Sequence, residues 1–202
     1  MTVDGLFRTL FWLLLGGVMV MRVYFMLQVK RAGERLMPDK AAIQREGRGM
    51  FLARFIGFFA LLFILFSYAL YLPWIAALAA SFPAWSRWLG FALGIASLAF
   101  WAWVQAALGK HWSAQLQLRE GHQLVTSGPY AHIRHPLYTA MLGISIAFAL
   151  TSGNWIFVAF AALAVLGLFL RVPREEKMML DEFGDEYRAY MQRTGRFFPK
   201  WK

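Results

Sequence analysis

The sequence predicts an all-α integral membrane protein with about five transmembrane helices. Three observations carry this prediction: the composition, the length of the apolar runs, and the placement of the basic residues. Of 202 residues, 59% are hydrophobic and only 16% are charged, whereas soluble domains average about 45–50% apolar and about 25% charged residues. Because a chain of this length cannot hide so much apolar surface in one water-facing core, we expect lipid around it.

Apolar runs of the length that a bilayer requires, about 20 residues, occur at residues 6–27, 55–78 and 88–108. A fourth run, 137–172, is interrupted by polar and small residues at 151–154. At about 1.5 Å per residue this run is too long for one crossing, so it predicts two helices joined by a tight turn. The first run is too long for a signal peptide and a basic segment follows it, so we interpret it as a retained helix.

The basic residues predict the orientation. They concentrate between the first and second spans, between the third and fourth, and after the fifth, while the alternate side carries little more than Arg8 and Arg87. Since positively charged loops stay in the cytoplasm, we expect the N-terminus outside and the C-terminus inside. The net charge of +10 is therefore not interpreted as a nucleic-acid surface. The chain has no cysteine, which excludes disulfides, thiolate metal sites and a catalytic thiol.

Polar residues that could do chemistry gather in two segments on the predicted cytoplasmic side. The first, residues 115–138, contains the turn signal Ser127-Gly128-Pro129 and ends where Pro136 is expected to open the fourth span. The backbone amides of such a helix start can face a polar ligand. This segment holds three of the four histidines and two tyrosines: His122, His132, His135, Tyr130 and Tyr138.

The second segment, residues 171–201, begins with Arg171 and Glu175, which are four positions apart and would share one face of a helix. Pro173 lies between them and is expected either to kink the fifth span or to start a new helix. Beyond it, apolar residues recur at helical spacing, which predicts an amphipathic helix that lies on the membrane or covers a pocket.

A metal site could be built from His132, His135, Glu175 and Glu176, because histidine and carboxylate ligands suit zinc or iron. Pro136 constrains the backbone there, and no third histidine has metal-like spacing. We therefore predict no metal.

The ordered set of motifs resembles the isoprenylcysteine carboxyl methyltransferase family, which is related to the phospholipid N-methyltransferases. The motifs are GHQLVTSGPYAHIRHPLY, two apolar helices, R-x-x-x-E-E, FGDEYRAY and a final FFP. The match covers roughly residues 105–201. The resemblance implies S-adenosylmethionine as cofactor, a cytoplasmic cofactor-binding loop, and a lipophilic or lipidated acceptor. It implies cofactor contacts from Gln115, His122, Gln123, Leu124, Val125, Tyr130, His135, Pro136, Leu137, Tyr138 and Glu175, and places Arg171 at the methyl acceptor.

The chemistry suits these residues. Methyl transfer from a sulfonium is an in-line displacement that depends mostly on positioning. A carboxylate acceptor is already ionised, so it requires an anchor such as Arg171 and no general base. An amine acceptor would need a base, for which Glu176 or a histidine is the candidate.

Three other hypotheses stay open: an NADPH-dependent membrane reductase of the sterol reductase type, a phospholipid or amine N-methyltransferase, and a membrane scaffold or transport component without enzymatic activity. Under the methyltransferase hypothesis, residues 1–108 form a scaffold and acceptor access path, and residues 109–202 form the catalytic region. The sequence does not identify the acceptor.

Overall fold

The computed structural model describes residues 3–31, 48–108 and 124–200, and all regular elements in these ranges are helices. The long helices are α1 (Val3–Arg31), α3 (Arg48–Ala69), α5 (Ala84–Leu108), α6 (Pro136–Ser152) and α7 (Trp155–Arg193); the short ones are α4 (Pro73–Ala76) and the 3₁₀ helix η2 (Gly128–Ala131). Each predicted span falls on a long helix. By length and composition α1, α5 and α7 could cross a membrane, and α3 and α6 contain shorter apolar helices.

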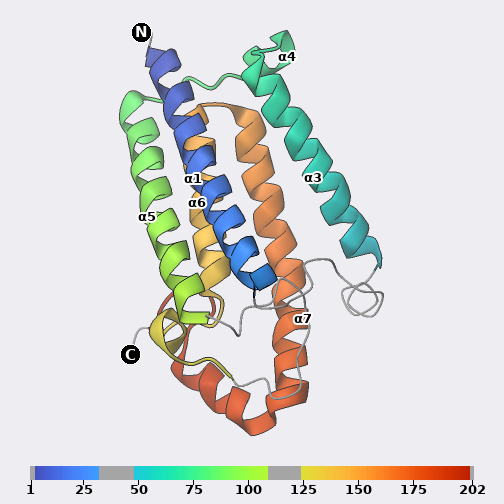
Figure 1. Cartoon of the computed structure of the whole chain (residues 1–202). Coiled ribbons are helices and arrows are strands. Elements are labelled where there is room, and N and C mark those ends of the chain that lie inside the picture. Colours follow the sequence, from blue (N-terminus) through green and yellow to red (C-terminus); the bar gives the residue numbers. More distant parts are fainter. Residues whose placement is uncertain (1–2, 32–47, 109–123, 201–202) are drawn as a thin grey trace.

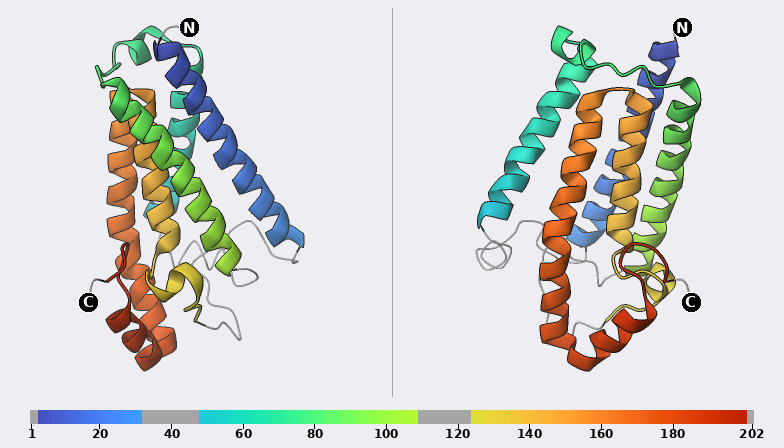
Figure 2. Two further views of the ribbon diagram at one scale, coloured as in Figure 1. Left: turned by 90° about the vertical axis from the view of Figure 1, so that its left-hand side faces the viewer. Right: turned by 180° about the vertical axis from the view of Figure 1, so that it is seen from behind.

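The long helices run side by side as a bundle. Seen from behind, α3, α7, α6 and α5 follow one another in a row, and α1 crosses on the other face (Figures 1 and 2). The N-terminus, α4 and the turn between α6 and α7 lie at one end of the bundle, which we call the N-terminal end. The second half of α7, η2 and the last residues of the chain lie at the opposite end, which we call the polar end.

Small residues allow α5 and α6 to pack closely. A methyl group added to Gly90 would come within 2.5 Å of Leu150 Cβ and 2.9 Å of the Thr151 backbone nitrogen. A methyl group on Gly94 would collide with the Leu14 side chain of α1, 2.8 Å away. Close backbone approach at small residues is how helices associate where lipid removes the hydrophobic driving force. The Gly90/Gly94 pair thus serves the packing of α5 against α6 and α1.

Arg8 and Arg87, the two basic residues that departed from the predicted charge asymmetry, bind helix ends. The Arg87 guanidinium donates to the Thr151 carbonyl at 3.2 Å, near the end of α6, and pairs with Asp4 at 2.6 Å. Arg8 donates to the carbonyls of Tyr68 and Ala69, at the end of α3, at 3.0 and 3.2 Å. Because the last carbonyls of a helix have no partner within it, these side chains satisfy groups that lipid could not.

The turn predicted at residues 151–154 is present and well defined. Gly153 adopts a left-handed conformation (φ 58°, ψ 43°) after α6, as helix ends often require. The Asn154 side chain accepts a hydrogen bond from the Ile156 N–H at 3.0 Å and so caps α7. Its amide also donates to the Ile75 carbonyl at 2.8 Å, which ties α4 to this turn.

Two boundaries differ from the sequence prediction. The second span was expected to end at residue 78, but α3 ends at Ala69, because Pro73 holds Leu72 in an extended conformation (φ −58°, ψ 148°) and starts α4. Of the two outcomes expected at Pro173, the start of a new helix is wrong. The helix continues through it, and the break comes at Gly184, whose backbone (φ 50°, ψ −119°) only glycine adopts readily.

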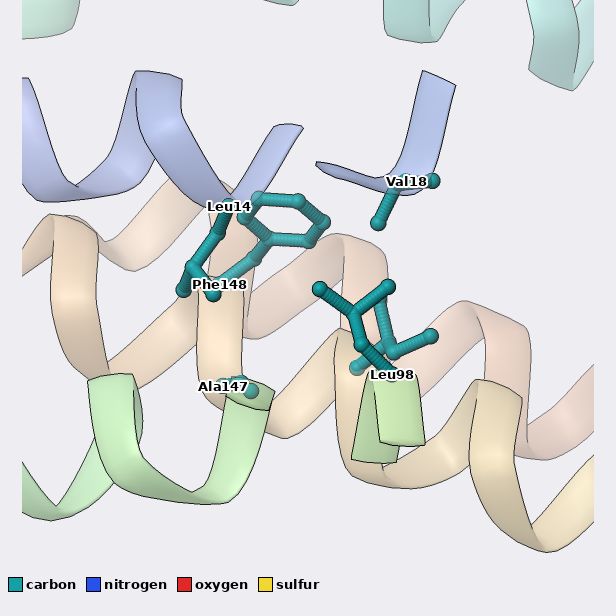
Figure 3. Close-up of a pocket in the computed structure, with 7 residues that line it drawn as sticks. Leu14, Val18, Leu98, Ala147 and Phe148 are labelled. Carbon is teal, nitrogen blue, oxygen red and sulfur yellow. The ribbon is translucent and has the colours of Figure 1, made fainter. Parts of the chain in front are cut away.

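A small apolar pocket lies in the seam between α1, α5 and α6 (Figure 3). It has no room for a water molecule and is lined by Leu14, Val18, Gly94, Leu98, Ile144, Ala147 and Phe148. Since no polar side chain faces it, this pocket offers nothing to bind a charged cofactor.

The packing of Gly90 gives a matched pair of substitutions. Gly90→Ala should destabilise the bundle by about 1–3 kcal/mol, because the added methyl group meets the Thr151 backbone, which cannot rotate away. Gly167→Ala in α7 should be neutral or slightly stabilising, since nothing lies within 4 Å of its added methyl group. Thermal unfolding in detergent measures both, and equal melting temperatures for the two variants would contradict the close α5–α6 contact.

Candidate active site

The candidate site lies at the polar end of the bundle, where the start of α6 meets the middle of α7 (Figure 1). The apolar part of α7 ends at Leu170, and a charged stretch follows without interruption of the helix. Phe169 and Leu170 expose 62% and 54% of their surface, as side chains facing lipid would. The first charged residue of this stretch, Arg171, therefore comes directly after a lipid-facing surface.

Tyr138, Glu175 and Arg171 form the first group of the site. The Tyr138 hydroxyl donates to Glu175 Oε2 at 2.6 Å. The Arg171 guanidinium carbon lies 5.9 Å from the centre of the Tyr138 ring. Because α7 stays helical through Pro173, Arg171 and Glu175 both face Tyr138, as their spacing predicted. One carboxylate and one guanidinium thus stand side by side at the apolar boundary.

Glu176 belongs to a second, buried group. Its Oε1 accepts hydrogen bonds from Arg134 Nε at 3.1 Å and Arg196 Nε at 3.2 Å, and its Oε2 accepts one from Arg196 Nη2. His135 Nε2 lies 3.3 Å from Oε1. Burial by itself raises the pKa of Glu176, but the hydrogen bonds from His135, Arg196 and Arg134 outweigh it and lower the pKa to about 2. A carboxylate held this way is a poor proton acceptor at neutral pH, so the amine-base role considered for it has no support here.

His135 joins the two groups. Its ring is stacked on the Tyr138 ring, with 5.6 Å between centres and 18° between planes, while its Nε2 faces Glu176. The backbone of His135 (φ −121°, ψ 57°) is not helical, because it precedes Pro136, and Pro136 is the first residue of α6 as predicted. Since the His135 side chain is 6% exposed, its ring is fixed by packing on one side and charge on the other.

The loop before α6 is anchored from below by the second half of α7. Gly128, with φ 58°, starts η2, and the Tyr190 hydroxyl donates to the Tyr130 carbonyl at 2.7 Å. Tyr130, Leu124 and Val125 are half-buried in this loop. The amphipathic helix predicted here is the second half of α7, in which Tyr187 and Tyr190 are buried.

The structure brings some of the predicted residues together and leaves others apart. Tyr138, Glu175, Arg171, His135 and the Pro136-Leu137 helix start form one neighbourhood. His132 is exposed and takes no part in it. Gln115, His122 and Gln123 lie outside the described residues. Within the part of the chain that the structure describes, no group of three or more histidine, cysteine, aspartate or glutamate side chains could hold a metal ion.

Sequence reasoning missed Arg134 and Arg196, the two arginines bound to Glu176. Both belong to or adjoin motifs that the resemblance uses: Arg134 begins Arg-His-Pro, and Arg196 directly precedes the final Phe-Phe-Pro. Their positions next to those motifs were the available signal, but nothing local indicates that they meet one carboxylate 42 and 20 positions away.

Known proteins resemble this chain over part of its length. Residues 88–181 match the isoprenylcysteine carboxyl methyltransferase (ICMT) family. Methanethiol S-methyltransferase 1 of Bradyrhizobium diazoefficiens is 38% identical over 36% of this chain and 25% of its own length. The cobalt-zinc-cadmium resistance protein CzcN of Cupriavidus metallidurans is 38% identical over 47% of this chain and 44% of its own length. Protein-S-isoprenylcysteine O-methyltransferase of Schizosaccharomyces pombe is 30% identical over 39% and 34%. The chain thus spans less than half the length of these relatives.

A solved structure shares the fold. The eukaryotic intramembrane Ras methyltransferase ICMT superposes with a TM-score of 0.58 at 21% identity, over 92% of this chain and 66% of that one. Together with the long apolar helices, this likeness confirms the predicted all-α integral membrane fold.

The Glu176 group predicts how stability depends on pH. Because its pKa is lowered from 4.5 to about 2 on folding, the ionised carboxylate stabilises the folded state above pH about 4.5, and this stabilisation is lost as the pH falls toward 2. Glu176→Gln should lower the melting temperature at pH 7 and flatten its fall between pH 5 and pH 3. The exposed Glu186→Gln serves as control and should keep the wild-type profile; an unchanged profile in Glu176→Gln would contradict the assignment.

Proposed function

We propose that this chain, whose residues 88–181 belong to the isoprenylcysteine carboxyl methyltransferase family, is a membrane-embedded methyltransferase. It would move a methyl group from S-adenosylmethionine to a carboxylate on a lipophilic acceptor, such as an isoprenylcysteine-like substrate. The observation that carries this proposal is the Tyr138–Glu175–Arg171 group at the apolar boundary of α7.

The side chains of this group fit the cofactor and the acceptor. S-adenosylmethionine presents an ammonium group and ribose hydroxyls, for which the Glu175 carboxylate is a suitable partner. Arg171 offers a planar guanidinium that binds a carboxylate through two hydrogen bonds. When bound, the cofactor supplies an electrophilic methyl group. The protein then has to hold an acceptor oxygen in line with it, a task of positioning rather than of proton transfer.

The acceptor that the site favours is one that is already ionised. A carboxylate has a pKa of about 4 in water, so it needs no base. An amine must lose a proton first, yet Glu176 is committed to Arg134 and Arg196, and His135 Nε2 faces the same carboxylate. The described residues of the site therefore support carboxylate methylation over amine methylation.

The position of Arg171 favours a lipophilic acceptor. An apolar tail can stay against exposed Phe169 and Leu170 while its carboxylate reaches Arg171, the next residue of α7. Partial exclusion of water there would strengthen the ion pair between guanidinium and carboxylate. In this proposal the site faces the cytoplasm, residues 1–108 provide the scaffold and acceptor access, and residues 109–202 carry the chemistry.

A thiol acceptor is the second candidate. It is favoured by the 38% identity with methanethiol S-methyltransferase 1, whose name specifies transfer to sulfur. A thiol has a pKa of about 8.5 in water, so unlike a carboxylate it must first lose its proton, to solvent where no base is assigned. The resulting thiolate would be bound as an anion beside Arg171, and experiment separates the two acceptors.

Cofactor binding tests the proposal first. In detergent, S-adenosylmethionine and S-adenosylhomocysteine should raise the melting temperature by mass action, equivalent to about 2.7 kcal/mol at 100 times the dissociation constant. Glu175→Ala should abolish most of this shift, and the exposed Glu182→Ala should retain it. Stabilisation by NADPH in place of the two adenosyl compounds would favour a reductase instead.

Acceptor choice is tested with labelled methyl donor. An isoprenylcysteine-like carboxylate should be methylated, and the matching carboxamide should not. Arg171→Gln should raise the KM for the carboxylate at least tenfold, because the charged hydrogen bonds are lost, while binding of S-adenosylhomocysteine changes less. Preference for a small thiol over the carboxylate would move the assignment to S-methylation.

A further inference from the structure

The residues that follow α7, 194–199, form a strap that returns to the start of α6. The Gly195 N–H donates to the His132 carbonyl at 3.0 Å, and the Arg134 and His135 N–H groups donate to the carbonyls of Gly195 and Arg196 at 2.8 and 3.0 Å. The Thr139 hydroxyl donates to the Phe197 carbonyl at 2.6 Å. This C-terminal strap therefore lies against residues 132–139, which lead into α6 and form its first turn.

The strap also carries Arg196, whose positive charge pairs with the buried carboxylate of Glu176. Glu176 is 5% exposed and its partner Arg134 is 9% exposed, but Arg196 keeps 44% of its side chain accessible. Arg196 binds both oxygens of the Glu176 carboxylate, a two-point contact that fixes the direction of that group. Arg196 of the C-terminal strap thus contributes, with Arg134 and His135, to the orientation of the buried Glu176 carboxylate.

From Glu176 the contacts continue to the candidate site. His135 Nε2 faces Glu176 Oε1, the His135 ring is stacked on Tyr138, and the Tyr138 hydroxyl binds Glu175. Phe197 of the strap also contacts the His135 ring, with 6.2 Å between ring centres. Each side chain in this series contacts the next one. A change in the orientation of Glu176 should therefore alter the positions of Tyr138 and Glu175.

We propose that Arg196 is a positioning residue of the site: bound to both oxygens of Glu176, it fixes His135 and through it the Tyr138–Glu175 pair that would hold the cofactor. This inference rests on the proposed function and adds to it a residue that touches neither cofactor nor acceptor. A lysine could supply the charge of Arg196 but not its two-point contact.

The test is direct binding of S-adenosylhomocysteine to purified full-length protein, measured by calorimetry at a temperature where every variant is folded. Arg196→Gln should weaken binding about tenfold, and Arg196→Lys should recover part of the loss. The matched control is Arg188→Gln, which removes an equally charged residue of α7 whose pair with Asp185 is exposed; its affinity should equal that of the wild type.

A double-variant cycle separates positioning from general loss of stability. If Arg196 acts through Glu176, adding Arg196→Gln to Glu176→Gln should change the affinity little further, whereas independent effects would multiply. Wild-type affinity in folded Arg196→Gln would overturn this inference alone, and so would fully multiplicative losses. Absence of binding by the wild type would overturn the proposed function, and this inference with it.

Discussion

The buried carboxylate of Glu176 is the group on which the polar end of this protein depends. Removing a charge from water carries a penalty of several kcal/mol, and such a charge persists only where its partners satisfy it. Here the partners come from the loop before α6 and from the C-terminal strap, while the carboxylate itself belongs to α7. Satisfying one ion therefore requires three separate segments to be in place together.

That requirement explains how a rigid site can exist beside a lipid-facing surface. Loops at a membrane boundary have few apolar contacts with which to fix their shape. The segment 132–135 instead bonds to the strap through its backbone and to Glu176 through Arg134 and His135. Two neighbouring glutamates of one helix thus have different roles. Glu176 holds three segments of the structure together, whereas Glu175, bound by Tyr138, belongs to the cofactor site that we propose.

The N-terminal end of the bundle solves the same physical problem with fewer groups. There carbonyls near the ends of α3 and α6 accept hydrogen bonds from Arg8 and Arg87, and Asn154 caps α7. Polar side chains in both regions complete hydrogen bonds that lipid cannot make. Between them the helices need only pack, and small residues such as Gly90 allow that.

The sequence by itself determined what depends on neighbours along the chain. Apolar runs located the long helices, the 151–154 break located the α6–α7 turn, and Pro136 marked the start of α6, because span length, turn chemistry and proline geometry are local properties. The four-residue spacing of Arg171 and Glu175 likewise indicated their common face. Only the tertiary structure decided that α7 continues through Pro173 and breaks at Gly184, and that Arg134 and Arg196 meet at Glu176. Partners 42 and 20 positions apart are brought together by how helices and strap fold onto one another, which no local pattern encodes.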